Sequence, residues 1–303
     1  MNDPRYEDHF GAVARAGHRV LRLVRWHAKG LLRRPRTALL ELRWRLGDEI
    51  MALPIIDVFQ ARHPSTRVHV WTNYPELYEG YRVEARGEAP DGAMDRYVFL
   101  RDVPRDAYRS ERYARLASIP TPSAPPCLRF ADWNAPMLPK RSQPLVALAR
   151  GASWPTKRWP AERWTALSTA LRDQGCTVVS MGVTGEAIEA DVDLVGRTNV
   201  REAACVLHHA NLLVCCDSGL MHLALAAGTP VVALFGPTDP DLYVRNQPLF
   251  HPLRSSSECA GFWNHSPEVP TAGRCPLGHA VCLESIAVAD VLNAAQSCLE
   301  RNG

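Results

Sequence analysis

A short polar cluster interrupts an otherwise apolar segment in the C-terminal half of the chain. The segment CDSGLMHLALAAGTPVVALFGPTDP (216–240) reads as a strand end, a turn, a helix, a second strand and a second turn. Ser218 can cap the helix, Gly219 lets the backbone approach a ligand closely, and His222 lies one turn into the helix. Helix capping explains Asp217 or Ser218, but it does not explain both residues together with a histidine that faces the same strand end. The spacing therefore predicts an anion-binding site at a helix N-terminus.

Two other loops carry residues suited to a nucleotide. The segment RGASWPTKRWPAERW (150–164) follows an apolar strand, and its small-residue turn with Ser153 and the ammonium of Lys157 suits a phosphate. Glu186 follows the strand TVVS, where an acid can receive ribose hydroxyls. Each residue also has a plain alternative: Lys157 as a surface residue, and Glu186 as a first-turn acid that favours the helix dipole.

A fourth candidate lies in the N-terminal half. The apolar run Ala38–Leu42, a Gly47-Asp48 turn, a helical stretch to Ala61 and the strand RVHVW predict a β-α-β unit. Asp48 then sits at the start of the helix, which should lower its pKa and keep the carboxylate ionised. The alternative is that Asp48 only caps this helix.

The elements that position these residues alternate regularly after residue 143. Strands that are apolar throughout alternate with helices, including a helix over GEAIEADV (185–192), so we predict a parallel sheet covered on both faces. Ligands bind outside the carboxyl ends of such strands. The four strand ends, the last followed by the rigid turn Pro237–Pro240, should form one crevice. Between residues 75 and 139 the pattern is weaker, with a strand RYVFL, a helix RSERYARLASI and a Pro-rich break.

Composition sets the class of protein. The chain has 303 residues, 46% of them hydrophobic and 22% charged, which predicts a folded protein of two domains and argues against disorder or a fibrous repeat. Nine cysteines scattered through apolar patches favour a reducing cytoplasm. No apolar run reaches the length of a membrane span, so we expect a soluble or peripheral protein.

The net charge of +3 hides a basic N-terminal segment. Residues 10–34 fit an amphipathic helix ended by Pro35, and no acid occurs among its basic residues Arg15, Arg19, Arg22, Arg25, Lys29, Arg33, Arg34 and Arg36. Such a helix can lie on an anionic bilayer or pack on the following domain with a solvated basic face. Nucleic acid is not expected as a partner, because no aromatic stacking platform accompanies the charge.

Together these motifs resemble the heptosyltransferase family, glycosyltransferase family 9. The resemblance rests on LGDEIMALP (46–54), GASWPTKRWPAERW (151–164), residues 194–240 with the block Asp-Ser-Gly-x-x-His, and CLESIAVADVLNAA (282–295). It implies the GT-B fold, an α/β architecture of two Rossmann-like domains that face a central cleft. The implied units are the basic helical extension (1–36), a shortened acceptor-side domain (37–142), a nucleotide-sugar-binding domain (143–285) and a C-terminal helix (286–303).

The resemblance also implies a function. It implies inverting, metal-independent transfer of a sugar, commonly heptose from ADP-heptose, to a glycan, lipid-linked or protein acceptor in lipopolysaccharide or related cell-surface polysaccharide synthesis. No cofactor is required beyond the nucleotide-sugar substrate. Asp48 would be the general base, Asp217 would hold the sugar, Glu186 the ribose, and Ser153, Lys157, Ser218, Gly219 and His222 the phosphates. Such an enzyme would be cytoplasmic, with the basic helix available to contact the inner face of the membrane.

Two alternatives and one extra cluster stay open at this stage. The same fold could support a nucleotide-sugar epimerase or hydrolase, or a non-catalytic protein that binds a nucleotide sugar or assembles on a membrane. The extension before the first strand and the short stretch 75–139 depart from the family and leave the acceptor unspecified. Zinc or iron ligands could come from Cys259, Cys275, His279 and Cys282, but no paired C-x-x-C is present, and the plain interpretation is buried or loop-stabilising thiols.

Overall fold

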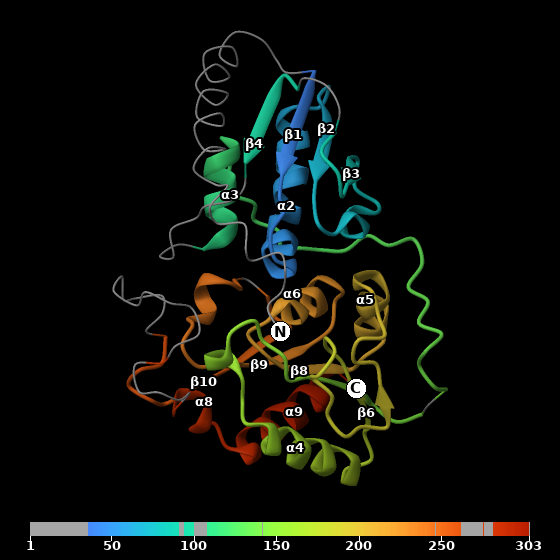
Figure 1. Ribbon diagram of the computed structural model, residues 1–303, viewed down its shortest axis with the longest axis vertical. Helices are drawn as coiled ribbons and strands as arrows, with labels where there is room; N and C mark the ends of the chain where they lie inside the picture. The colour runs from blue at the N-terminus through green and yellow to red at the C-terminus, as the bar shows by residue number, and fades with distance from the viewer. Residues whose placement is uncertain are drawn as a thin grey trace.

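The computed structural model describes residues 36–90, 94–99, 108–140, 142–245, 247–261, 275 and 281–302. The predicted basic helix over 10–34 lies outside these residues, so its membrane contact stays a prediction. Two α/β units are stacked along the long axis of the molecule, and the segment that follows α3 connects them along one side (Figure 1). None of the helices in the described part is long and apolar enough to cross a membrane.

The N-terminal unit is built on a parallel four-stranded sheet of order β3-β2-β1-β4. The predicted β-α-β unit and the weaker strand and helix after it are confirmed, whereas β3 was not expected. The helix α2 begins at Leu46, so Gly47 and Asp48 lie within its first turn rather than in a turn before it. The elements are β1 (Thr37–Glu41), α2 (Leu46–Arg62), β2 (Arg67–Trp71), η2 (Pro75–Tyr78), β3 (Glu84–Arg86), β4 (Arg96–Phe99) and α3 (Arg109–Ala117).

The C-terminal unit contains a parallel six-stranded sheet of order β10-β9-β8-β5-β6-β7. The predicted strands that precede the four polar loops are β5, β6, β8 and β9, and the sheet order makes them neighbours, as expected. The elements are β5 (Leu145–Ala149), η3 (Pro155–Lys157), α4 (Ala161–Asp173), β6 (Thr177–Ser180), β7 (Val192–Asp193), α5 (Val200–His208), β8 (Leu212–Cys216), α6 (Gly219–Ala226), β9 (Val231–Phe235), η4 (Pro240–Leu242), β10 (Phe250–Arg254), α8 (Val281–Glu284) and α9 (Val288–Asn302).

The helix predicted over residues 185–192 is wrong. This stretch forms turns and then the short edge strand β7, which pairs with β6. Gly182 (φ 148°) and Gly185 (φ 92°) hold the backbone in a region that side chains rarely adopt, so the chain leaves β6 through a turn instead of entering a helix. The strands β7 and β10 were not expected.

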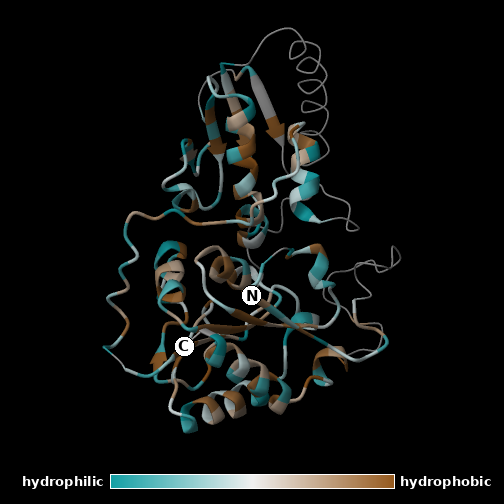
Figure 2. Ribbon diagram, turned by 180° about the vertical axis from the view of Figure 1, so that it is seen from behind, coloured by the Kyte–Doolittle hydropathy of each residue, from teal (hydrophilic) through white to brown (hydrophobic). Residues whose placement is uncertain are grey.

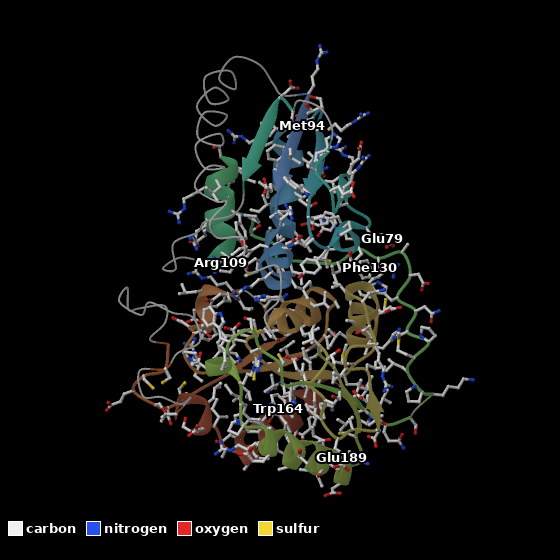
Figure 3. The ribbon with its side chains drawn as sticks, viewed as in Figure 1. Glu79, Met94, Arg109, Phe130, Trp164 and Glu189 are labelled. Atoms are coloured by element: carbon white, nitrogen blue, oxygen red, sulfur yellow. The ribbon has the colours of Figure 1, made fainter. Side chains whose placement is uncertain are left out.

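The strands of the larger sheet are buried on both faces. Every residue of β5, β8 and β9 is buried, as the apolar sequences of these strands require when helices cover both sides (Figure 2). Trp164 on α4 is completely buried beneath the sheet and meets Trp159 edge to face at 5.2 Å between ring centroids (Figure 3). The core on the other face is continuous between the units, because one cluster of buried side chains includes both Ile50 of α2 and Met221 of α6.

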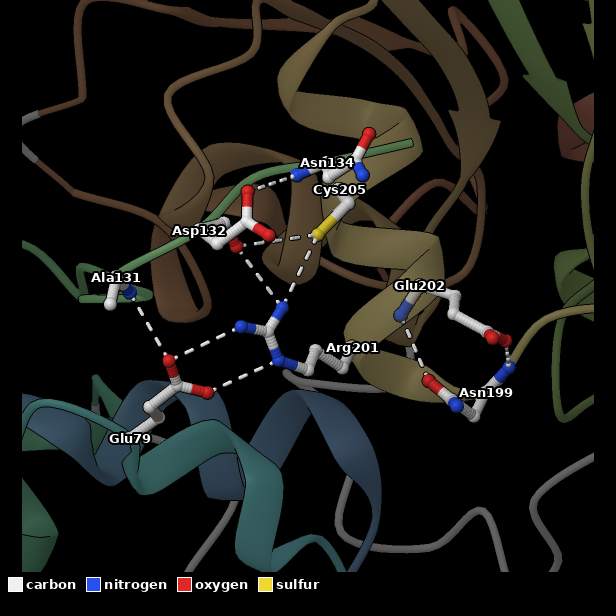
Figure 4. A network of polar contacts seen from close by, with 8 residues as sticks. All are labelled: Glu79, Ala131, Asp132, Asn134, Asn199, Arg201, Glu202 and Cys205. Atoms are coloured by element: carbon white, nitrogen blue, oxygen red, sulfur yellow. Dashed lines mark hydrogen bonds and ion pairs between the residues drawn. The ribbon is translucent and has the colours of Figure 1, made fainter. Parts of the chain in front are cut away.

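An ion-pair network ties the two units at one rim (Figure 4). Arg201 on α5 donates to both carboxylate oxygens of Glu79, from Nε at 3.1 Å and from Nη2 at 3.2 Å. Its Nη1 donates to the carbonyl of Asp132 in the connecting segment at 3.1 Å, and the guanidinium lies 4.6 Å from the ring centroid of Phe130. The backbone N–H of Ala131 donates to Glu79, and this bond lowers the pKa of that carboxyl together with Arg201. One side chain thus joins both units and the segment between them.

We expect Arg201→Ala to lower the free energy of unfolding by about 1 kcal/mol, because both charges of the pair are about one-third exposed and solvent screens them. Arg197→Ala is the matched control: its side chain is 68% exposed and lies 4.0 Å from Asp193 within the same unit. Urea unfolding at low and high salt would measure both variants. Equal losses for the two would contradict a specific contribution of the rim network.

Candidate active site

A buried ion pair forms the floor of the site at the end of β8. Lys157 Nζ lies 2.5 Å from Asp217 Oδ2, and both side chains are more than 90% buried. Thr238, in the turn after β9, donates its hydroxyl to the same oxygen at 2.7 Å. Burial alone would raise the pKa of Asp217, but the ammonium and the two hydrogen bonds outweigh it and hold the pKa below its ordinary value. Asp217 is therefore a fixed carboxylate with one oxygen committed to Lys157.

The N-terminus of α6 lies next to this ion pair, because the helix begins two residues after Asp217. Gly219 is the first residue of the helix, and Ser218 occupies the N-cap position. The prediction that Ser218 caps with its side chain is wrong: the N-cap makes no such bond, and within the described part of the chain the buried Oγ has no hydrogen-bond partner. The free N–H groups of the first helical turn and this hydroxyl together offer donors to an anion.

His222 on α6 is neutral at physiological pH. Burial lowers the pKa of its imidazole to about 4, although the carboxylate of Asp217 acts in the opposite direction. The side chain can therefore donate one hydrogen bond to a ligand but brings no positive charge. This refines the role that the resemblance implies for it.

Asp48 faces this floor from the N-terminal unit. Its Oδ1 accepts from the Tyr113 hydroxyl at 3.3 Å and lies 3.6 Å from Nε of Arg109, and both partners come from α3. The expectation that the helix start lowers its pKa is wrong, because burial raises the pKa and dominates over Arg109, Arg45 and the Tyr113 hydrogen bond. A carboxylate with a raised pKa is a stronger base than a solvated one. Figure 3 shows Arg109 at the level where the two units meet.

Two glycines let the units approach closely at this point. A Cβ atom on Gly47 would lie 2.7 Å from the His222 ring, and one on Gly219 would lie 3.1 Å from the Cβ atom of Leu46. The first turns of α2 and α6 therefore pack directly on each other. This contact brings Asp48 and Asp217 to opposite sides of one cleft.

A belt of alternating cations and aromatic rings lines the cleft. The Trp154 ring centroid lies 4.2 Å from Lys157 Nζ and 5.8 Å from Arg45 Cζ. The Tyr243 ring centroid lies 5.7 Å from the same Lys157 atom and 5.9 Å from Arg109 Cζ. Three cations from both units thus converge between the two buried carboxylates.

Ser153 and Glu186 lie at the ends of β5 and β6. The Ser153 hydroxyl is exposed and accepts a hydrogen bond from Arg45 Nη1 of the other unit at 3.2 Å. The Glu186 carboxylate accepts from the backbone N–H of Val183 and packs against Gly151 and Gly182, where any Cβ atom would collide with it. Glu186 therefore borders the crevice at the strand ends, but from a turn and not from the first turn of a helix.

Glu49 anchors the loop that carries the N-terminal side of the site. Its side chain is completely buried, and its carboxylate accepts the backbone N–H groups of Trp44 and Asn73 and the hydroxyls of Thr72 and Tyr78. Burial raises the pKa of this carboxyl to about 7 against those hydrogen bonds. Glu49 does not face the cleft, but it fixes the chain between β1 and Asp48.

The structure thus brings together Asp48, Ser153, Lys157, Asp217, Ser218, Gly219 and His222, with Glu186 at the border. Sequence reasoning missed Arg45, Arg109, Tyr113, Thr238 and Tyr243. The sequence GPTDP contained a usable signal for Thr238, because this turn follows β9, and β9 pairs with β8, the strand that ends just before Asp217. Arg109 and Tyr113 gave none, since an amphipathic helix alone does not say which unit its polar side chains face.

The cysteine cluster is only partly described. Burial, and then the neighbouring thiols of Cys259 and Cys275, raise the pKa of Cys282 to about 11, so the three sulfurs lie near one another. Among the described residues no three His, Cys, Asp or Glu side chains are arranged to hold a metal, and His279 lies outside them. The site chemistry below uses no group from this cluster.

A small hollow adjoins the cleft on the α3 side. Its walls come from both units and include Met51 of α2, His222 of α6, Tyr108, Tyr243 and Gln247. Met51 lies one turn after Asp48 on the same helix. The hollow therefore borders the helix that carries Asp48.

Comparison with known proteins identifies relatives with this architecture. A sequence model described as glycosyltransferase family 9 (heptosyltransferase) matches residues 118–272. Lipopolysaccharide heptosyltransferase 2 of Salmonella typhimurium is 30% identical over 194 residues, which cover 52% of this chain and 55% of that protein. The alignments with the first curated relatives span between a third and about half of their lengths.

Solved structures show the same fold. The structure of E. coli ADP-heptose lps heptosyltransferase II superposes with a TM-score of 0.69 at 21% identity, covering 88% of this chain and 99% of that one. The dodecameric iron-containing heptosyltransferase TibC in complex with ADP-D-beta-D-heptose gives a TM-score of 0.74 at 18% identity, covering 90% and 78%. The predicted GT-B fold is thereby confirmed.

The raised pKa of Glu49 predicts a specific pH dependence of stability. The folded carboxyl binds a proton up to about pH 7, whereas the unfolded one releases it near its ordinary value of 4.5. Between these values the folded state binds more protons, so the free energy of unfolding should fall as pH rises, by up to about 3 kcal/mol. Glu49→Gln keeps the size of the side chain and its carbonyl acceptor, and should remove this part of the pH dependence.

Urea unfolding at pH 5 and pH 8 would measure this difference, with Glu88→Gln as the control at an exposed position. The control should follow the unmodified chain at both pH values. If Glu49→Gln also follows it, the buried carboxyl does not titrate in this range.

Proposed function

The chain belongs to glycosyltransferase family 9, and from this premise we propose that it is an inverting, metal-independent glycosyltransferase that transfers heptose from ADP-heptose. The acceptor is a glycan or a lipid-linked saccharide in lipopolysaccharide or related cell-surface polysaccharide synthesis. The observation that carries this proposal is the pair of buried carboxylates, Asp48 and Asp217, on opposite units with three cations between them. The names of the relatives, two of which refer to ADP-heptose, support the choice of donor.

The geometry assigns complementary tasks to the two carboxylates. Asp217 is kept ionised and fixed by Lys157 and Thr238, so its second oxygen can accept hydroxyls of the donor sugar. Asp48, whose pKa burial raises, is suited to accept a proton. Opposite pKa shifts of two neighbouring acids are a common way to divide binding from proton transfer.

The reaction then follows from these positions. Asp48 removes the proton of the acceptor hydroxyl, and the oxygen attacks the anomeric carbon from the side of the N-terminal unit. The bond between that carbon and the diphosphate oxygen breaks on the opposite side, and its electron pair leaves with the diphosphate. Lys157 and the free N–H groups of α6 stabilise the developing negative charge. Attack and departure from opposite sides invert the configuration at the anomeric carbon.

The hollow beside Met51 borders the helix that carries Asp48, which supports an acceptor that approaches from this side. It opens on the α3 side of the cleft, whereas the nucleotide would lie toward Glu186 at the ends of β5 and β6. Donor and acceptor would therefore enter from different sides. The epimerase, hydrolase and non-catalytic alternatives are not favoured by the relatives.

The proposal also includes a cytoplasmic location at the inner face of the membrane. Its support is the basic segment with eight Lys and Arg residues between Arg15 and Arg36, each of which can add about 1 kcal/mol of attraction to an anionic surface. Flotation with phosphatidylglycerol vesicles would test it, with neutral vesicles as the control. Equal flotation with both would contradict an electrostatic contact.

The donor is tested by thermal unfolding of the purified protein with ADP-, GDP-, UDP- and dTDP-sugars. We expect ADP-heptose to raise the midpoint of unfolding more than the other compounds, because a ligand that binds only the folded state stabilises it. Mass spectrometry of co-purified nucleotide sugar gives an independent readout. Stabilisation by none of these compounds would contradict the proposed function.

Asp48→Asn should lower kcat by about 10²–10⁴-fold, the usual contribution of a general base. Donor affinity should stay close to that of the unmodified chain, since Asp217 and Lys157 are untouched. Asp57→Asn is the matched control: it lies on the same helix, but its carboxylate is half exposed and pairs with Arg129 outside the cleft. Turnover and donor binding measured side by side decide the role, and unchanged turnover would remove Asp48 from the mechanism.

A further inference from the structure

Arg45 reaches from the N-terminal unit into the part of the cleft where phosphates are expected. It is the N-cap residue of α2, and its Nη1 donates to the Ser153 hydroxyl of the other unit at 3.2 Å. Ser153 belongs to the small-residue turn after β5, which also leads to Lys157. Arg45 therefore contacts the phosphate-type loop directly from the N-terminal unit.

The position of Arg45 is tied to the N-terminus of α6. The next residue, Leu46, packs on Gly219, where a Cβ atom would lie only 3.1 Å from the Cβ atom of Leu46. At that helix end, the first-turn N–H groups have no acceptor within the helix itself, and the buried Ser218 hydroxyl has no hydrogen-bond partner among the described residues. A cation thus lies beside a group of hydrogen-bond donors, which is the arrangement that an oxyanion needs.

The charges of the cleft point to the same conclusion. Asp217 contacts Lys157 at 2.5 Å and Asp48 lies 3.6 Å from Arg109, so each buried carboxylate already has a cation beside it. Arg45 adds a third cation, and Arg45 and Lys157 converge on the Trp154 ring, with 5.8 and 4.2 Å to its centroid. The indole limits where both cations can lie, so their positive charges are held near one place before a ligand arrives.

We propose that Arg45 is a further donor-binding residue, supplied by the N-terminal unit, which holds the diphosphate of the nucleotide sugar together with Lys157 and the amides of α6. The diphosphate takes the place of Ser153 as the hydrogen-bond partner of the guanidinium. When the bond to the anomeric carbon breaks, its electron pair moves to the diphosphate oxygen, and the guanidinium stabilises that charge. This inference rests on the proposed function, because it requires a nucleotide-diphosphate donor.

The consequence is that both units contribute to donor binding. A donor held only by the C-terminal unit would leave the position of Asp48 independent of the diphosphate. With Arg45 three residues before Asp48 on the same chain segment, the ligand that supplies the sugar also draws the base toward it. Arg45 thereby acts on the position of the N-terminal unit as well as on the leaving group.

The test compares Arg45→Ala and Arg45→Lys with Arg43→Ala, a matched control two residues away whose exposed guanidinium stacks on Trp71 at 4.6 Å. Calorimetry would measure the binding of ADP and AMP to each full-length protein. We expect Arg45→Ala to weaken ADP binding by about tenfold or more, as for loss of a hydrogen bond to a charged group, and AMP binding by less. Arg45→Lys should recover part of the loss, because it keeps the charge but not the planar fork. Arg43→Ala should leave both affinities unchanged.

Two results would overturn the inference. One is ADP binding to Arg45→Ala that is as tight as in the unmodified chain. The other is an equal loss for ADP and AMP in that variant, which would mean that Arg45 only organises the cleft. Absence of ADP binding in the unmodified chain is a separate result that contradicts the proposed function itself, so the two failures are distinguishable.

Discussion

The direct packing of α2 on α6 is the contact on which the site depends. Gly47 and Gly219 lack the side-chain atoms that would separate the two helices, so their first turns touch. Two helix N-termini that face each other bring two partial positive charges together, which is unfavourable without nearby acids. Asp48 lies in the first turn of α2 and Asp217 lies just before the N-cap residue of α6, so these two acids also offset the repulsion between the helix ends.

The two buried acids of the cleft have opposite pKa shifts because their partners lie at different distances. Removing a carboxylate from water raises its pKa unless a close cation and hydrogen bonds outweigh the loss of solvation. Asp217 has both at short distance, with Lys157 at 2.5 Å and Thr238 at 2.7 Å, whereas the contacts of Asp48 to Arg109 and Tyr113 are 3.6 and 3.3 Å long. A difference of about 1 Å in partner distance therefore separates a carboxylate that binds from one that can accept a proton.

The sequence predicted the features that depend on local pattern. Apolar strands between helices required a parallel sheet, and the carboxyl ends of such strands collected Lys157 and the Asp217 cluster without any knowledge of tertiary contacts. Features set by contacts between distant segments were missed. The pKa of Asp48 was predicted in the wrong direction because α3, some 60 residues later, buries it, and Arg45 was not considered because its partner Ser153 is 108 residues away. The helix predicted after β6 is absent for a local reason, since Gly182 and Gly185 adopt positive φ angles.

The rims of the cleft differ in character from its centre. At one rim Arg201 pairs with Glu79, and at the other Arg245 lies 2.7 Å from Glu111 of α3. These four side chains are between 33% and 41% exposed, so each pair contributes about 1 kcal/mol or less and weakens with salt. The centre is held by buried apolar packing and by ions that water does not screen. Breaking either rim pair therefore requires little free energy, whereas separating α2 from α6 would expose the buried contact that holds Asp48 near Asp217.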